Sequence, residues 1–423
     1  MSFLHPLSCE CTKSELDLFT LPVTQTSIER SAVIEYRPIA TIRRGGIIEF
    51  NIVGSGEDYI DLAETLLYVK LKVVPLGGAA LTADESTKVA PERQFLQTLF
   101  SQIDIFLNGK LVTDATDTYP YRAFIETALN YGYEAKKSQL TAGLWDPEDG
   151  SIALSKPIEL MGRIHADIFN QHKLMLNNVD IKIRLVPNKS QFSLHLHPNA
   201  EEAFLPQIEI LEASLFVKKV RPAPFILSAH ANALQTSTAK YSYRNTQIRT
   251  HTIAQGSSSC HIDNLTTSAI PTRIILGFVT DQSFNGSYKN SPTLFQHHHL
   301  NYLSLHVDGD QIPSKPLQPD FQEGHYLRSY YTLFTATDKA MNDSGNAISR
   351  KDYVDKGFVL YAFDITQDSS ADKDSHTNLI RQGVVRVEAK FAKALPQAVV
   401  LIAYIEKDGL LEIGRDRNIL LDN

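Results

Sequence analysis

Residues 99–112 read LFSQIDIFLNGKLV, and residues 300–317 repeat the pattern as LNYLSLHVDGDQIPSKPL. In each stretch three apolar residues at alternate positions lead into a turn dipeptide, Asn108-Gly109 or Asp308-Gly309. Alternation with a period of two is typical of a half-buried β-strand. Asn-Gly and Asp-Gly supply the positive φ angles of a type I′ turn. Both stretches therefore predict a β-hairpin, and the two turns lie 200 residues apart in the chain.

A helix and then a strand follow each predicted hairpin. Residues 121–129 and 326–334 each carry apolar side chains at helical spacing, which predicts one apolar stripe per helix. Residues 179–185 and 385–391 alternate again and predict strands. Arg122 is equivalent to Arg328 in this repeat and Val179 to Val385, both at a separation of 206 residues. The same three elements in the same order indicate that the chain contains one architecture twice.

Further strands are predicted at 66–74 and 208–217, with turn residues between the strands. A repeating unit of about 200 residues is too long for a solenoid and fits an eight-stranded barrel. We therefore expect an all-β chain of two eight-stranded jelly rolls with short inserted helices. The expected division is an N-terminal arm at 1–30, a first jelly roll at 31–222, a linker at 223–240 that could be helical, and a second jelly roll at 241–423. Loops are expected at 75–94, 141–157, 281–296, 338–356 and 367–378.

Composition narrows the class of protein. The 423 residues are 43% hydrophobic and carry a formal net charge of −7, which argues against an open, basic nucleic-acid reader. Three cysteines cannot form the disulfide framework of a small secreted domain. The sequence lacks the pattern of a signal peptide and has no run of 18 apolar residues, so we expect an intracellular protein without a membrane span.

No group of residues predicts a catalytic, cofactor or metal site, and we expect the chain not to be an enzyme. Gly54-Ser55-Gly56 lacks the outer glycine of a nucleophile elbow and is interpreted as a bend. His297–His299 would alternate faces on a strand and could not all bind one metal ion, and His306 follows further along the chain. His195 and His197 would share one face, but no carboxylate or thiolate stands beside them at familiar ligand spacing, so they are assigned to a surface loop. The remaining candidates are interpreted as structural or as solvated surface: Cys9 and Cys11, the loop anchor Trp145, the strand-rim acids Glu57, Asp58 and Asp61, the loop acids Asp368, Asp372 and Asp374, and the short basic patches Arg43-Arg44 and Lys218-Lys219.

Long stretches resemble the double-jelly-roll major capsid proteins, above all the hexon-like proteins of Maverick/Polinton elements and adintoviruses. The resemblance runs from about residue 14 to 423 and is carried by SELDLFTLPVTQTSIE (14–29), SGEDYIDL (55–62), residues 99–112, YPYRAFIETALNYG (119–132), GRIHADIF (162–169), FNGSYKNSP (284–292), residues 300–321 and EIGRDRN (412–418). The segment 143–156 is shorter than the corresponding loop of many relatives.

The resemblance implies a viral capsid protein that forms homotrimers, each a pseudo-hexagonal capsomer of an icosahedral shell. It further implies contacts with neighbouring capsomers and with penton and minor capsid proteins, at most weak non-specific contact with packaged DNA, and no cofactor. The expected location is the virion, and the host cell interior during assembly. The apolar side chains of the arm suit a segment that becomes ordered on a neighbouring copy. Two alternatives remain open: a carbohydrate-binding or carbohydrate-active β-sandwich protein, and a domesticated host copy that keeps the fold but does not assemble.

Overall fold

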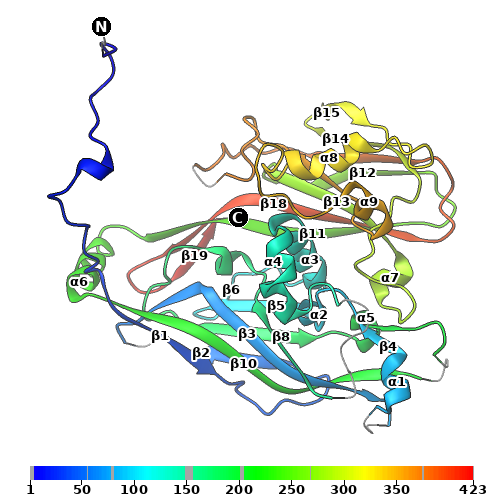
Figure 1. Cartoon of the computed structure of the whole chain (residues 1–423), viewed down its shortest axis with the longest axis horizontal. Coiled ribbons are helices and arrows are strands. Elements are labelled where there is room, and N and C mark those ends of the chain that lie inside the picture. The colour runs from blue at the N-terminus through cyan, green and yellow to red at the C-terminus, as the bar shows by residue number, and fades with distance from the viewer. Residues whose placement is uncertain are drawn as a thin grey trace.

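The computed structural model describes residues 4–54, 56–77, 81–147, 156–200, 204–266, 268–373 and 376–422. Two β-barrels pack against each other, and an N-terminal segment extends away from both (Figure 1). Helices α3 (Tyr119–Asn130) and α4 (Tyr133–Lys137) lie between the barrels.

The first barrel contains two four-stranded antiparallel sheets. One sheet has the strand order β1-β10-β3-β7 and the other has the order β2-β8-β5-β6. The strands are β1 Ile28–Tyr36, β2 Ile48–Ile52, β3 Tyr59–Pro75, β5 Phe100–Leu107, β6 Lys110–Leu111, β7 Ile158–Arg163, β8 Ile181–Pro187 and β10 Pro206–Pro222. A separate pair, β4 (Val89–Pro91) and β9 (Leu194–Leu196), lies outside these two sheets.

The second barrel is built in the same way. Its sheets have the orders β11-β18-β13-β16 and β12-β17-β14-β15, and β19 pairs with the end of β18. The strands are β11 Ala239–Ile253, β12 Ser259–Thr266, β13 Arg273–Thr280, β14 Leu300–Val307, β15 Asp310–Leu317, β16 Leu360–Asp364, β17 Val385–Phe391, β18 Val399–Ile413 and β19 Ile419–Asp422.

The two barrels share one topology. When the eight barrel strands of each half are counted along the chain, one sheet has the order 1-8-3-6 and the other 2-7-4-5 in both halves. This arrangement of eight antiparallel strands in two sheets is a jelly roll. The prediction of an all-β chain with two eight-stranded jelly rolls is therefore confirmed.

The two predicted hairpin turns are formed by equivalent residues. Asn108 and Gly109 have φ angles of 47° and 80°, and Asp308 and Gly309 have φ angles of 50° and 97°. The Asn108 side chain accepts a hydrogen bond from the Asp180 backbone N–H at 2.7 Å, just before β8. The Asp308 carboxylate accepts one from the Val384 N–H at 3.0 Å, just before β17. Each turn is thus tied to the start of the equivalent strand in its own half, β8 or β17.

Both predicted helices are present, as α3 and α8 (Leu327–Thr335). They differ in their surroundings. Helix α8 has an exposed face, whereas every residue of α3 from Tyr119 to Leu129 is buried. The expectation of a single apolar stripe is therefore too simple for α3, because this helix packs against both barrels.

Each barrel has its own hydrophobic core, and α3 contributes to both. Tyr119 and Ala123 belong to the core of the first barrel, whereas Tyr121, Phe124 and three further α3 side chains pack with the second. The end of the chain also crosses over. Leu411, Ile413 and Ile419, from β18 and β19, lie in the core of the first barrel.

Several predicted loops contain regular structure. The segment 75–94 contains α1 (Ala83–Thr87) and β4. Helix α1 begins there because Thr82 and Glu85 form a reciprocal capping box. Part of the expected loop 141–157 lies outside the described residues. The other short helices are η1 Ser14–Leu16, α2 Phe95–Thr98, η2 Gln139–Gly143, η4 Asp167–Asn170, α5 Ser190–Ser193, α6 Pro224–Ala233, α7 Asp281–Asn285 and α9 Arg350–Asp355.

Candidate functional site: the buried contact between the two barrels

Aromatic rings join the barrels around α3. The Phe124 ring stacks on Trp145 and on Phe295 with centroids 5.6 Å apart, and on Phe358 at 5.8 Å. Trp145 belongs to the first half of the chain, and the two phenylalanines belong to the second. Stacked aromatic pairs stabilise a contact beyond the area that they bury. Phe124 is therefore the centre of the apolar contact between the barrels.

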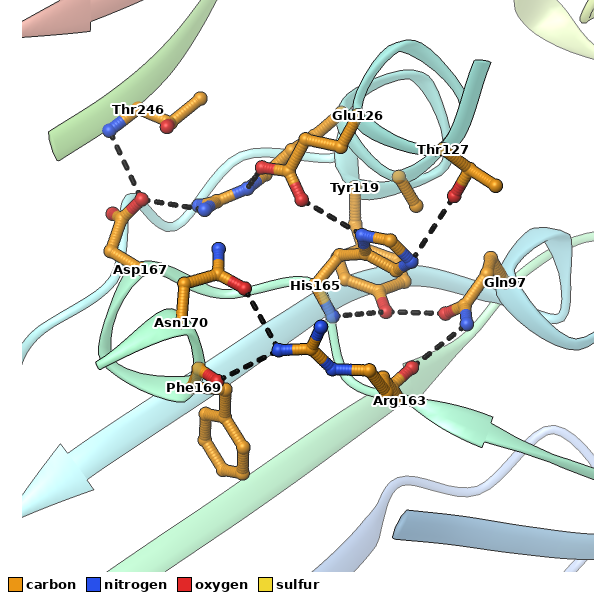
Figure 2. Close-up of polar contacts among 12 residues, drawn as sticks. Gln97, Tyr119, Glu126, Thr127, Arg163, His165, Asp167, Phe169, Asn170 and Thr246 are labelled. Carbon is orange, nitrogen blue, oxygen red and sulfur yellow. Dashed lines mark hydrogen bonds and ion pairs between the residues drawn. The ribbon is translucent and has the colours of Figure 1, made fainter. Parts of the chain in front are cut away.

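Beside this aromatic cluster lies a buried polar network, shown in part in Figure 2. Its members carry charges or hydrogen-bonding groups and come from both halves of the chain. We call it the inter-barrel polar network, and it consists of Arg122, Glu126, His165, Asp167, Thr246, Arg273, Tyr404 and Glu406.

The part of the network on the first barrel is centred on Arg122. Its guanidinium donates to the Glu126 carboxylate at 2.8 Å and to Asp167 at 2.5 Å. His165 Nδ1 lies 2.8 Å from the second oxygen of Glu126, and Figure 2 shows its other ring nitrogen facing Thr127. Asp167 also accepts a hydrogen bond from the Thr246 backbone N–H at 3.2 Å. This last bond connects the first barrel to β11 of the second.

The part on the second barrel is centred on Arg273. Its guanidinium makes two hydrogen bonds to the Glu406 carboxylate, at 2.7 and 2.9 Å, and donates to Asp372 at 2.7 Å. The Tyr404 hydroxyl donates to Glu406 at 2.6 Å and lies 3.5 Å from Glu126. Tyr404 therefore joins the two parts of the network.

Charge pairing sets the protonation states in this network. Burial alone would raise the pKa of the Glu126 carboxyl, but Arg122 and His165 lower it to about 2. Burial likewise opposes ionisation of Glu406, and Arg273 nevertheless holds its pKa below the ordinary value. For Asp167 burial prevails over Arg122 and raises the pKa. Buried charges that are paired and hydrogen-bonded strongly disfavour the loss of one partner. The network thus fixes one relative position of the barrels.

Two lysines bind the C-terminal end of α3. Lys136 Nζ donates to the carbonyls of Ala128 and Asn346, at 2.8 and 2.6 Å. Lys339, from the second half, donates to the carbonyls of Leu129 and Asn130, at 2.5 and 2.8 Å. Cations at this end of a helix complement its dipole and its unpaired carbonyls.

Replacing Lys136 with methionine is expected to change how stability depends on pH. Burial and the nearby Lys339 ammonium lower the pKa of Lys136 from 10.5 to about 7. Between these two values the unfolded chain binds more protons at this site, so the stability of the wild type rises with pH there. The difference in unfolding free energy between wild type and variant should rise by up to about 1.4 kcal/mol per pH unit above pH 7. Urea unfolding at pH 7, 8 and 9 measures it. The exposed Lys351→Met is the control, and parallel curves for wild type and Lys136→Met would contradict the assignment.

A second charge pair, near β4, is hydrogen-bonded to residues of the second half. Glu92 contacts His195 and accepts hydrogen bonds from the hydroxyls of Ser291 at 2.8 Å and Thr293 at 2.5 Å. Burial would raise the pKa of the Glu92 carboxyl, but His195 and the hydroxyl donors lower it. The expectation that His195 lies in a surface loop is wrong. His195 lies on β9, and its partner is 103 residues away in the sequence.

The triple histidine does not lie on a strand, as was expected, but precedes β14 in a turn. His298 and His299 have φ angles of 44° and 55°, and the His297 ring stacks on Phe321 with centroids 4.2 Å apart. Within the described ranges no cluster of three or more His, Cys, Asp or Glu side chains could hold a metal ion.

The acidic candidates are occupied by ion pairs. Asp58 lies 3.0 Å from Arg221, and Asp61 lies 3.2 Å from Lys218. Glu57 lies 4.0 Å from Arg221. Asp61 lies on β3, and Glu57 and Asp58 lie just before this strand. Asp372, expected in a solvated loop, instead pairs with Arg273, and Asp374 lies outside the described residues.

The remaining candidates have structural surroundings. Gly54 has no room for a side chain, because a Cβ would lie 2.2 Å from the Val179 carbonyl oxygen, and Ser55 lies outside the described residues. Trp145 is buried, as a loop anchor would be. Cys9 and Cys11 are exposed free thiols. In the part of the chain that the structure describes, no helix combines the length and hydropathy needed to cross a membrane.

Sequence reasoning did not find the inter-barrel polar network. Local signals for it did exist. Arg122 and Glu126 stand four residues apart in an otherwise apolar helix, and Arg273 begins the strand RIILGFVT, in which every residue is buried. A charged residue in such surroundings requires a partner.

Comparison with known proteins shows similarity over nearly the full chain. No family model matches the sequence. An uncharacterized protein of Caenorhabditis elegans is 24% identical over 421 residues, which cover 95% of this chain and 100% of that protein. The PBCV-1 virus capsid gives a TM-score of 0.63 at 9% identity and covers 96% of this chain and 99% of its own. The Sputnik virophage structure gives 0.62 at 11% identity, covering 98% and 93%, and the mavirus major capsid protein gives 0.52 at 11%, covering 100% and 95%. The chain therefore has the double jelly-roll fold of these capsid proteins.

Proposed function

We propose that this chain is a viral major capsid protein, three copies of which form a pseudo-hexagonal capsomer of an icosahedral shell. The observation that carries the proposal is the pair of barrels with identical strand order, packed together in one chain whose whole length matches solved capsid structures. Two similar barrels give one chain two sides of a hexagon. Three copies related by a threefold axis then supply all six sides, and the closed ring limits further growth.

The rigid contact between the barrels supports this function. A hexagonal outline requires the two barrels of every copy to keep the same relative position. The inter-barrel polar network and the Phe124 cluster provide that constraint, because both are buried and span the two halves. Packed interiors resist continuous deformation.

Strand β1 supports the presence of a partner surface. It lies at the edge of its sheet, and every residue from Ile28 to Glu35 is exposed. Val33 is 62% exposed on this strand. Proteins avoid long, apolar, uncovered edge strands unless a partner covers them. Burial of this edge between copies follows naturally from the proposed assembly.

Purified protein is expected to be a homotrimer of three 47.3 kDa chains. Obligate contacts of this kind bury roughly 2,000–5,000 Å² each and survive dilution. Native mass spectrometry measures the mass, and negative-stain class averages show whether the outline is hexagonal. Monomers alone at micromolar concentration, with the fold intact by circular dichroism, would overturn the trimer.

We further propose the finer assignments that the sequence suggests. The domains are the arm 1–30, the jelly rolls 31–222 and 241–423, and the linker 223–240, which is supported by α6 and by the start of β11 at Ala239. The lineage is that of Maverick/Polinton elements and adintoviruses, and the partners are penton and minor capsid proteins. The chain would act in the virion and, during assembly, inside the host cell, without enzymatic activity.

A second candidate function has one specific observation in its favour. A nematode protein matches 95% of this sequence over its own full length, which suits a copy resident in an animal genome that retains the fold without building shells. The trimer measurement separates the two, since a non-assembling copy would give folded monomers.

A further inference from the structure

An apolar groove lies where the N-terminal arm joins the first barrel. It has a volume of about 520 Å³, within the range of cavities that bury ligands. Its floor and walls come from α6, the start of β11 and the segment before β8. The lining includes Leu174, Leu176, Ile226, Ala233, Leu234 and Tyr241. We call it the α6 groove, and it is occupied by no part of the described chain.

Two lysines lie on the rim of the α6 groove, and the nearby Glu412 carboxylate accepts a hydrogen bond from the Thr238 hydroxyl. The lysines are Lys173 and Lys240, and Lys173 Nζ donates to the Lys240 carbonyl at 2.9 Å. Both lysines are exposed. An occupant should therefore combine apolar side chains with negative charge.

The N-terminal arm has this composition. Leu16, Leu18, Phe19, Leu21 and Val23 are between 68% and 101% exposed. Glu15 and Asp17 alternate with the first of these residues, in the sequence ELDLF at 15–19. A run of uncovered apolar side chains on an extended segment indicates a partner surface.

The arm is directed away from the groove of its own molecule. The Gln25 side chain donates to the Ile28 carbonyl at 3.0 Å and accepts from the Ile28 N–H at 2.8 Å, which fixes the point of exit. Beyond this point the chain runs outward from both barrels (Figure 1). The nine residues from Phe19 to Ser27, with eight steps between their Cα atoms, can span up to about 28 Å. That is far enough to reach an adjacent molecule.

We propose that the α6 groove binds residues 15–21 of the arm of a second copy. Leucine and phenylalanine side chains fill the apolar floor, while Glu15 and Asp17 meet Lys173 and Lys240 at the rim. This inference rests on the proposed function, because neighbouring capsid subunits present the same end of the molecule side by side. Each copy both gives an arm and receives one, which links copies without any additional protein.

Cysteine cross-linking of the full chain tests the exchange. In a background with Cys9 and Cys11 changed to serine, Leu18→Cys on the arm is combined with Ser237→Cys at the groove, and Cys260 stays buried. Mild oxidation should give reducible dimers and larger species on a denaturing gel. Leu18→Cys with the exposed Met341→Cys, on the second half, should give at least about tenfold fewer.

A matched pair of variants on α6 tests whether the groove is the receptor. Ala233→Trp fills the groove at an exposed position, whereas Ala231→Trp places the same ring on the same helix away from the lining. Ala233→Trp should lower the cross-linked fraction by about tenfold or more, because the indole overpacks the contact, and Ala231→Trp should leave it unchanged.

The outcomes distinguish the two proposals. Absence of cross-links, or a cross-link confined within one chain, overturns arm exchange. Native mass spectrometry of the same samples shows independently whether trimers form. Trimers without cross-links would refute the arm contact alone. Cross-links in a protein that never forms trimers would refute the capsomer and leave the arm contact standing.

Discussion

Replacement of Phe124 with alanine should lower the free energy of unfolding by about 3–5 kcal/mol, the usual cost of removing a fully buried aromatic ring. The side chain has no exposed surface and stacks on three rings from both halves of the chain. The cavity would open between the barrels rather than inside either one. We therefore expect the loss of stability to be accompanied by fewer correctly formed trimers.

Denaturant unfolding followed by circular dichroism measures this change. Phe225→Ala is the control, because Phe225 is 58% exposed on α6 and should shift the unfolding free energy by no more than about 0.5 kcal/mol. Equal effects of the two substitutions would show that Phe124 does not hold the barrels together.

Replacement of Arg273 with methionine should cost about 3–5 kcal/mol, because it removes the guanidinium that is hydrogen-bonded to the buried Glu406 carboxylate. The Tyr404 hydroxyl and Arg244, 3.9 Å away, would then remain beside that carboxylate. The side chains of Arg273 and Glu406 are both 4% exposed, and the guanidinium makes two hydrogen bonds to the carboxylate. The loss should shrink as the pH falls toward 4.5. In the wild type the depressed pKa of Glu406 contributes stability above its ordinary value of 4.5, and this contribution is lost below that value. In the variant the buried carboxyl, without its Arg273 partner, can take up a proton.

The double variant Arg273→Met/Glu406→Leu provides the matched control. It removes both charges and should recover most of the lost stability, since apolar residues often replace a buried ion pair at little cost. A double variant as unstable as the single one would show that the damage comes from lost packing and not from the unpaired charge.

The fold could be predicted from sequence because its strongest signals are local. Alternation into Asn108-Gly109 and Asp308-Gly309 specifies both a strand and its turn, and the repeat of this pattern specifies two barrels. These signals do not depend on contacts with residues that are distant in the sequence. They are therefore sufficient for the fold class and for the internal repeat, but they carry no information about how the barrels meet.

The contact between the barrels could not be predicted for the opposite reason. Periodicity treats Arg122 and Glu126 as a solvated face of α3, and only the position of Asp167 and Tyr404 shows that this face is buried. Glu92 and His195 are 103 residues apart, so no local pattern pairs them. The strand expected through His297–His299 failed because positive φ angles end it before β14.

The crossing of the last strands into the first barrel has a consequence for biosynthesis. Leu411, Ile413 and Ile419 complete a core that also contains Ile48 and Phe50. A ribosome finishes β10 at Pro222 and must add about 190 more residues before Ile413 emerges, which takes roughly 10–40 s at cellular rates of translation. During that interval the part of the first barrel's apolar core that these three residues cover stays exposed to solvent. Overproduction at low temperature with abundant holdase chaperones should therefore improve recovery of the intact molecule.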